Sequence, residues 1–169
     1  MIKYLKYVLA MGMLIGYIAD AQTATQITAK ITSTANVIGN VDLIVLKDLE
    51  FVVSSSLSPT ELTIDPQKDW QSGQIKLIGF PKSLVRVTSE KQSILLHENG
   101  QSQLFFTYNI SGSPVNVQGK SILLTKTNEV NLSDRGVYYL WMGGQLSGLE
   151  NIIPGNYTME LKIDVEYIL

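Results

Sequence analysis

The sequence predicts an all-β domain, a sandwich or barrel of short antiparallel strands. Apolar and polar residues alternate over short segments, turn residues separate these segments at intervals of roughly 8–12 residues, and no apolar repeat at helical spacing extends over a full helix length. About eight to ten strands are expected from this pattern. A sandwich is preferred over a barrel because the segments differ in length and the loops between them are uneven.

The clearest strand ends the chain, at residues 155–169 (GNYTMELKIDVEYIL). Its apolar residues share one parity and its charged residues share the other, which is typical of an antiparallel strand with one buried face. The turn residues 154–156 (PGN) precede it. The inward residues of this strand are expected to be Tyr157, Met159, Leu161, Ile163, Val165 and Tyr167.

The other expected strands are shorter, and each is bounded by turn residues. The segment 41–53 is long and continuously apolar in its first half, so a bend or bulge is expected near Lys47 and Asp48. A turn is expected at 36–40, and a tight hairpin with positive φ at both Asn99 and Gly100. The expected strands are 26–33, 41–53, 62–64, 74–80, 84–89, 93–97, 103–111, 121–125 and 137–142.

The first 21 residues have the pattern of a secretory signal peptide. Lys3 and Lys6 form a basic start, an uncharged run follows from residue 7 to 19, and Ala19-Asp20-Ala21 is a cleavage site of the A-x-A type. The uncharged run is shorter than the roughly 20 residues that cross a bilayer, although a retained anchor remains the alternative. We therefore expect a single mature domain at 22–169, exported to the periplasm, the outer surface or the extracellular space, without a stable membrane span.

Composition limits the partners of this mature domain. Removing Lys3, Lys6 and Asp20 from the 13 basic and 15 acidic residues leaves a net charge of −3, which disfavours nucleic acid and anionic lipid as partners. The chain contains no Cys, so its stability must come from packing rather than from disulfides. The small signal peptide with a cleavage site of the A-x-A type and the absence of Cys suggest a bacterial protein.

No constellation of residues predicts catalysis, a metal or a cofactor. His97 is the single histidine, so the usual zinc sets and catalytic triads have too few members. Its position beside Asn99 and Gly100 predicts a solvent-facing turn residue. The acidic residues are scattered over the polar faces of strands, and the sequence contains no calcium loop of the D-x-D-x-D-G type. We expect a protein that is not an enzyme.

Aromatic residues give the stronger indication of binding. Trp70 lies in a polar loop between Asp69 and Gln71, which predicts an exposed indole. Near the C-terminus, Trp141 is expected in the core and Tyr138 on the surface. Trp70 and Tyr138 are therefore the candidate ligand contacts.

Three motifs lie in the C-terminal third, at residues 142–146 (MGGQL), 154–157 (PGNY) and 165–167 (VEY), and an L-x-F segment lies at 49–51 (LEF). The three motifs are similar to the pattern GG-x-L … G-x-Y … V-x-V-x-Y, and the chain therefore resembles a family of small secreted bacterial proteins of unknown function. The final strand departs from the pattern in reading I-D-V at 163–165, and Met159 stands where a glycine is usual. The same ending is distantly similar to spore-coat-protein-U and chaperone–usher pilin domains, which implies an immunoglobulin-like sandwich.

The resemblance implies a structural or adhesive protein of the cell surface, with a fimbrial or coat subunit as its sharpest form. Such subunits assemble by β-strand addition, in which a strand from a neighbouring copy or subunit completes the sheet. The segment 22–33 alternates as such a strand requires, with Ile27, Ala29 and Ile31 as its anchors. The same strand could instead complete the sheet of its own chain. The alternative function is a monomeric surface binding module with a glycan as its suggested ligand. A small hydrolase is a third possibility, for which the sequence contains no catalytic constellation.

Overall fold

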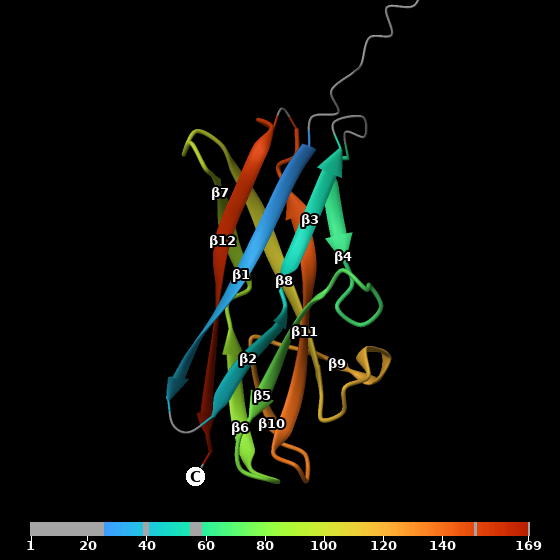
Figure 1. The fold of residues 1–169 in the computed structure, drawn as a ribbon, viewed down its shortest axis with the longest axis vertical. Coiled ribbons are helices and arrows are strands. Elements are labelled where there is room, and N and C mark those ends of the chain that lie inside the picture. The colour runs from blue at the N-terminus through green and yellow to red at the C-terminus, as the bar shows by residue number, and fades with distance from the viewer. Residues whose placement is uncertain (1–25, 39–40, 55–58, 151, 169) are drawn as a thin grey trace, which may run out of the picture.

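The computed structural model describes residues 26–38, 41–54, 59–150 and 152–168, which are nearly all β (Figure 1). One short 3-10 helix, η1 (Gln118–Lys120), interrupts the strands. The strands are β1 (Gln26–Ile38), β2 (Asp42–Lys47), β3 (Leu49–Ser54), β4 (Glu61–Ile64), β5 (Gly73–Ile78), β6 (Leu84–Ser89), β7 (Gln92–His97), β8 (Gln103–Ser113), β9 (Ile122–Leu124), β10 (Thr127–Asn131), β11 (Val137–Ser147) and β12 (Gly155–Tyr167).

The all-β prediction is confirmed, and most expected strands appear within a few residues of their predicted bounds. The segment 41–53 breaks at Asp48 into β2 and β3, as expected. Two expectations are wrong. β1 continues to Ile38 through part of the expected turn at 36–40, and β10 forms where no strand was predicted. The sequence of β10, TNEVN, contributes one buried apolar residue, Val130, so it carries too little alternation to be recognised.

All twelve strands belong to one sheet that curls into a near-barrel. Its hydrogen-bonded path runs β10-β6-β12-β7-β8-β11-β5-β2. β1 pairs with β12, and β3 pairs with β1, so the continuous chain from β3 through Asp48 to β2 connects the two sides of the path (Figure 1). The sequence pattern favours a sandwich because the strands and loops are uneven in length. The alternation of apolar and polar residues does not determine which strand edges pair, so it does not predict that the sheet curls into a near-barrel.

β1 lies between the last strand and β3 of its own chain. It runs parallel to β12 over twelve residue pairs, from Ile27 opposite Gly155 to Ile38 opposite Glu166. On its other side it pairs antiparallel with β3, where Ala29 lies opposite Phe51. Parallel neighbours cannot be joined by a tight turn and need a long connection. The pairing of β1 with β12 meets this requirement, because most of the chain lies between the two strands.

The long strands change partners along their length. β11 pairs with β5 through its first half and with β4 through its second half, and the change occurs at Gly143 and Gly144. A Cβ at Gly143 would lie 2.2 Å from the carbonyl oxygen of Ile64, and Gly144 has a φ of +145°. These two positions therefore require glycine, because a Cβ at Gly143 would push β4 away from β11, while a Cβ at Gly144 would lie 2.1 Å from the Thr107 carbonyl of β8 on a backbone with positive φ.

The core is built from the inward parity of the strands. Leu161 and Ile163 of β12 are fully buried, while Glu160 and Lys162 are exposed, so the predicted parity of the closing strand is confirmed. Tyr167 at the end of this strand is half-buried. Phe106 packs edge-on against Phe51 at 5.5 Å and against Tyr108 at 4.9 Å between ring centroids.

The predicted exposure of His97 is wrong. Its side chain is buried, and its ring packs edge-on against Tyr157 at 4.8 Å. Its Nδ1 accepts a hydrogen bond from the Asn99 N–H, and its Nε2 lies 3.1 Å from the carbonyl oxygen of Pro154. The hairpin also differs from the expectation, because Gly100 has a positive φ (+71°) and Asn99 does not.

The expected signal peptide, residues 1–21, lies outside the described residues. Among the residues that are described, no helix is long and apolar enough to cross a membrane.

Candidate ligand-binding site around Trp70

Trp70 projects from the loop 65–72 between β4 and β5, and its side chain is 80% exposed. The predicted exposure of this residue is therefore confirmed. Indole carries the largest apolar surface of any side chain, so leaving it in water forgoes a burial energy of roughly 2–3 kcal/mol. An exposed Trp on a well-formed loop is thus a feature that folding alone does not explain.

The Trp70 loop is held by hydrogen bonds of its own. The Asp69 N–H donates to the Asp65 carbonyl at 2.9 Å, and the Ser72 N–H donates to the Asp69 carbonyl at 3.1 Å. The Asp65 side chain accepts from the Gln67 N–H at 2.8 Å, which forms an Asx turn. The local sequence D-P-Q-K-D-W therefore specifies a compact turn rather than a loose connection.

A second set of hydrogen bonds fixes this loop to the body of the domain. The Gln118 side-chain amide Nε2 lies 3.0 Å from the Pro66 carbonyl, 2.9 Å from the Asp69 carbonyl and 3.2 Å from the Ser72 Oγ. Beneath it, the Ser111 Oγ donates to the Pro66 carbonyl at 3.1 Å. Because amide and hydroxyl groups satisfy buried carbonyls here, the loop is anchored at both ends.

Lys47, the last residue of β2, reaches the indole. Its Nζ lies 5.0 Å from the centre of the Trp70 ring, within cation–π range. The same ammonium group donates a hydrogen bond to the Trp70 carbonyl oxygen. Lys47 therefore orients the ring from one side.

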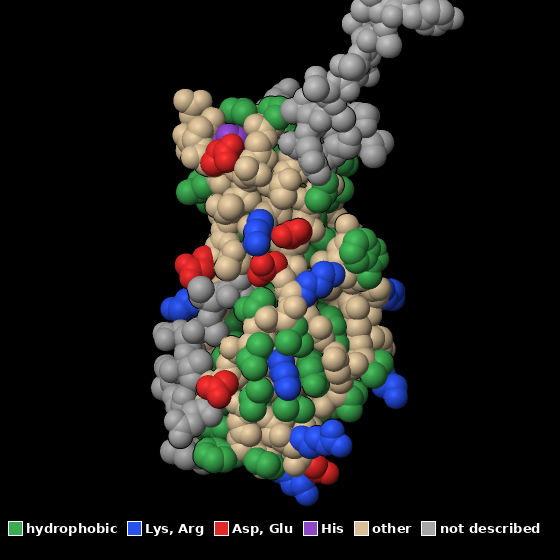
Figure 2. Space-filling view, in the orientation of Figure 1, with side chains coloured by type: hydrophobic (Ala, Val, Ile, Leu, Met, Phe, Trp, Pro, Cys, Tyr) green, Lys and Arg blue, Asp and Glu red, His purple; other side chains and the backbone are tan. Residues whose placement is uncertain are grey.

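Acidic residues border the site where the chain passes from β2 to β3. The Lys30 Nζ bridges Asp48 at 3.1 Å and Glu50 at 3.8 Å. The hydrogen bond that Lys30 donates to Asp48 and the negative charge of Asp48 raise the pKa of Lys30, with a smaller contribution from Glu50. Figure 2 shows acidic and basic side chains interspersed across the middle of this face of the molecule.

These groups enclose a pocket of about 300 Å³. The pocket combines one aromatic face, two carboxylates, an amide and an ammonium group, and it can therefore offer apolar contact together with both donors and acceptors. Its lining consists of Lys47, Asp48, Glu50, Val52, Trp70 and Gln71.

Tyr138, the second candidate contact, does not belong to this site. Its side chain is 3% exposed, so the expectation of a surface position is wrong. The ring packs over Gly112, where an added Cβ would lie 2.5 Å from it, and burial raises the pKa of its hydroxyl. Trp141 is buried, as expected. The sequence Y-Y-L-W does not alternate in polarity, so its inward parity could not be determined from pattern alone.

The anchor residues of the first segment occupy the core of their own chain. Ile27, Ala29 and Ile31 are all buried, on the face of β1 that joins the hydrophobic core. Their predicted alternation is confirmed.

Lys47 and Gln118 are the residues of the site that sequence reasoning did not identify. They lie 23 and 48 positions from Trp70, and no local motif connects them with it. Within the described ranges, no group of three His, Asp or Glu side chains could hold a metal ion.

Comparison with known proteins gives no relative from which a role could be transferred. No protein-family model matches the chain, and no curated protein matches its sequence.

Proposed function

We propose that this chain is an exported cell-surface binding module with an adhesive role, which contacts a glycan through Trp70. The observation that carries the proposal is an indole that is 80% exposed on a loop anchored by Gln118. A fixed, exposed aromatic ring loses little conformational freedom on binding, so most of its contact energy contributes to affinity.

The chemistry around Trp70 favours a sugar as the ligand. The C–H groups on one face of a pyranose ring pack against an aromatic plane, while its hydroxyl groups both donate and accept hydrogen bonds. The Asp48 and Glu50 carboxylates can accept from hydroxyls, and the Lys47 ammonium can donate to them. The pocket of about 300 Å³ is sized for one or two sugar rings rather than for a large ligand.

The near-barrel is proposed to be a relative of the immunoglobulin-like sandwich whose strands join into one curled sheet, with β1 of the same chain completing it. Support comes from β1, which pairs with β12 and β3 of its own chain, and from the resemblance of residues 142–167 to small secreted proteins. Export is supported by the leader pattern at residues 1–21. Sequencing the N-terminus of the exported protein should give Gln22 as its first residue.

A glycan array with fluorescently labelled protein tests the binding role. The parent should bind a subset of glycans, Trp70→Ala should lose this signal, and Trp70→Phe should keep part of it. Ile122→Ala removes another exposed apolar side chain (64% exposed) and should bind like the parent. A parent that binds no glycan, or a Trp70→Ala variant that binds equally well, would contradict the proposal.

A fimbrial or coat subunit is the second candidate, and the position of β1 favours it. β1 is the first strand of the described residues and lies between β12 and β3, so the same strand from a neighbouring copy or another subunit could make the same contacts. Assembly by such exchange predicts a ladder of oligomers that persists in mild denaturant. A strictly monomeric protein would favour the self-completed module.

A further inference from the structure

One aliphatic side chain lines the pocket beside Trp70. β3 alternates, with Leu49 and Phe51 buried and Glu50 and Val52 directed outward. Val52 is 53% exposed and lines the pocket together with Glu50, its neighbour on the same face of the strand. The wall that β3 forms therefore presents an isopropyl group beside a carboxylate, in addition to the indole of Trp70.

The charges of the lining disfavour acidic sugars. Asp48 and Glu50 contribute two carboxylates, and the ammonium group of Lys47 already contacts the Trp70 ring and its carbonyl oxygen. A sugar with a carboxylate of its own would bring a third negative group toward these two, and like charges repel one another.

A sugar with a free ammonium group fits little better. Lys30 already bridges Asp48 at 3.1 Å and Glu50 at 3.8 Å, so both carboxylates have a cation before any ligand arrives. A second ammonium group would meet Lys30 as a like charge, and it would gain nothing from the apolar side chain of Val52. The lining therefore favours a neutral sugar that carries an apolar group.

An N-acetylated amino sugar has this combination. Its acetamido group is planar and trans, so the N–H and the methyl group lie on one edge and the carbonyl oxygen lies on the other. The Glu50 carboxylate can accept from the N–H while Val52 contacts the methyl group, and the side-chain amide of Gln71 can donate to the carbonyl oxygen. A simple hexose has only hydroxyl groups to offer, and none of them matches Val52.

We propose that the pocket beside Trp70 selects glycans that contain an N-acetylated hexosamine. This inference rests on the glycan-binding role proposed above and adds the class of sugar. Trp70 provides a stacking surface that any pyranose can use, whereas Val52 and Glu50 provide the selection. Selection is a difference between two affinities, so ligands that differ only in the acetamido group measure it.

Isothermal titration calorimetry of the parent protein with three β-1,4-linked trimers tests the selection. Tri-N-acetylchitotriose, cellotriose and deacetylated chitotriose share one backbone and carry an acetamido, a hydroxyl or an ammonium group at the same carbon. The acetylated trimer should bind about tenfold more tightly than either of the others, because an apolar contact and a hydrogen bond depend on the acetamido group.

Three results would overturn the inference: equal affinities for the acetylated trimer and cellotriose, tighter binding of the ammonium trimer, or no binding of the acetylated trimer. The glycan array separates this failure from that of the proposed function. Binding of other glycans that Trp70→Ala abolishes would leave the proposed function intact, whereas an array without any binding would remove both.

Val52→Thr tests the assigned contact, because threonine has nearly the shape of valine and replaces one methyl group by a hydroxyl. Val52 is exposed, so the variant should melt like the parent. Its preference for the acetylated trimer should fall about fourfold, while its affinity for cellotriose should stay unchanged. An unchanged preference would overturn the role of Val52.

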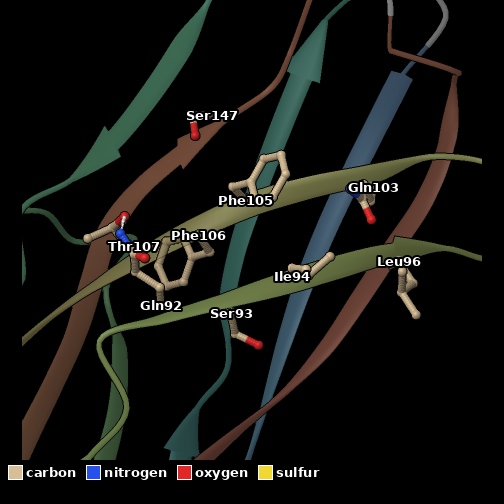
Figure 3. A pocket seen from close by; sticks show the side chains of 9 residues that line it. All are labelled: Gln92, Ser93, Ile94, Leu96, Gln103, Phe105, Phe106, Thr107 and Ser147. Carbon is tan, nitrogen blue, oxygen red and sulfur yellow. Dashed lines mark hydrogen bonds between the residues drawn. The ribbon is translucent and has the colours of Figure 1, made fainter.

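Leu96→Thr is the matched control. Leu96 is 54% exposed and lines a different hollow, of about 750 Å³, which residues of β7, β8 and β11 form (Figure 3). This hollow shares no lining residue with the pocket beside Trp70. The control should bind both trimers like the parent, and an equal loss of preference in Leu96→Thr and Val52→Thr would contradict the selection by Val52.

Discussion

The side-chain amide of Gln118 lies 2.9 Å from the carbonyl oxygen of Asp69, the residue that precedes Trp70, although the two are 49 positions apart. The same nitrogen also reaches the Pro66 carbonyl and the Ser72 Oγ. One side chain from η1 therefore holds three points of the loop that presents the indole. Loss of this contact should loosen the loop without removing any group that touches a ligand.

Gln118→Ala should increase local opening of the Trp70 loop. The variant removes the Gln118 amide from the carbonyls of Pro66 and Asp69, which keep the Ser111 Oγ and the Ser72 N–H as donors, so the loss should cost about 0.5–1.5 kcal/mol. Hydrogen exchange in residues 65–72 should become faster by roughly 2- to 10-fold, which corresponds to this range. Exchange in the strands of the core should stay unchanged.

Gln101→Ala is the matched control, since its amide is exposed in the β7–β8 hairpin. It should leave exchange in residues 65–72 as in the parent. Unchanged protection of the loop in Gln118→Ala would show that the local turn at Asp65 is sufficient to hold Trp70.

His97 and Gly155 form a packed pair whose effects on stability should not add. A Cβ at Gly155 would lie 2.2 Å from the His97 Nε2, and Gly155 has a φ of +144°. Gly155→Ala should therefore destabilise the fold through both the clash and the backbone conformation. His97→Ala should cost about 1–3 kcal/mol, because it leaves a cavity and removes the contact with Pro154.

The double variant separates the two causes. Removing the ring relieves the clash but not the strained φ, so the double variant should be more stable than the sum of the single effects predicts. Urea denaturation of the four proteins gives the coupling energy. Strict additivity would mean that the two side chains do not meet as described.

The sequence predicts those features of the fold that depend on residues close together in the chain, and it does not predict pairings between distant segments. The parity of β12 and the break at Asp48 follow from neighbouring residues, and both were predicted. The parallel pairing of β1 with β12 joins segments more than a hundred positions apart, and strand alternation contains no information about which edges meet. The fold class was therefore predictable in its coarse form, whereas the near-barrel closure was not.

The candidate site shows the same limit. The exposure of Trp70 was predicted because polar residues surround it in the chain. Tyr138 and His97 were misplaced because their burial depends on distant partners, Gly112 for the tyrosine and Gly155 for the histidine. Gln118 carried no local sign of its role, since the Asp69 carbonyl that it contacts lies 49 positions away in the chain.

Charge substitutions on the two faces of β12 should have opposite outcomes. Ile163 is fully buried, so Ile163→Asp loses a burial energy of roughly 1.5–3 kcal/mol and adds the cost of a buried carboxylate. We expect this variant not to fold. Lys162 points to solvent, and Lys162→Asp should melt near the parent temperature. Thermal melts followed by circular dichroism compare the two, and a cooperative melt of Ile163→Asp close to that of the parent would contradict the described parity.

Tyr108 should make the protein unstable in alkali. Burial raises the pKa of its hydroxyl to about 12, partly offset by a hydrogen bond with Ser93, and the charge of Glu90 raises it slightly further. A tyrosine in the unfolded chain ionises near pH 10. Between these values the unfolded state binds fewer protons than the folded state, so the free energy of unfolding falls as the pH rises.

The slope should approach about 1.4 kcal/mol for each pH unit between about pH 10 and 12 from Tyr108 alone. Below pH 10 this group should contribute no slope. Tyr108→Phe keeps the ring contact with Phe106 and removes the titrating hydroxyl, so its unfolding free energy should fall less steeply over this range. Urea denaturation at several pH values measures both proteins, and ultraviolet absorbance of tyrosinate follows ionisation directly. Equal slopes for the parent and Tyr108→Phe would show that Tyr108 ionises in the folded protein as readily as in the unfolded chain.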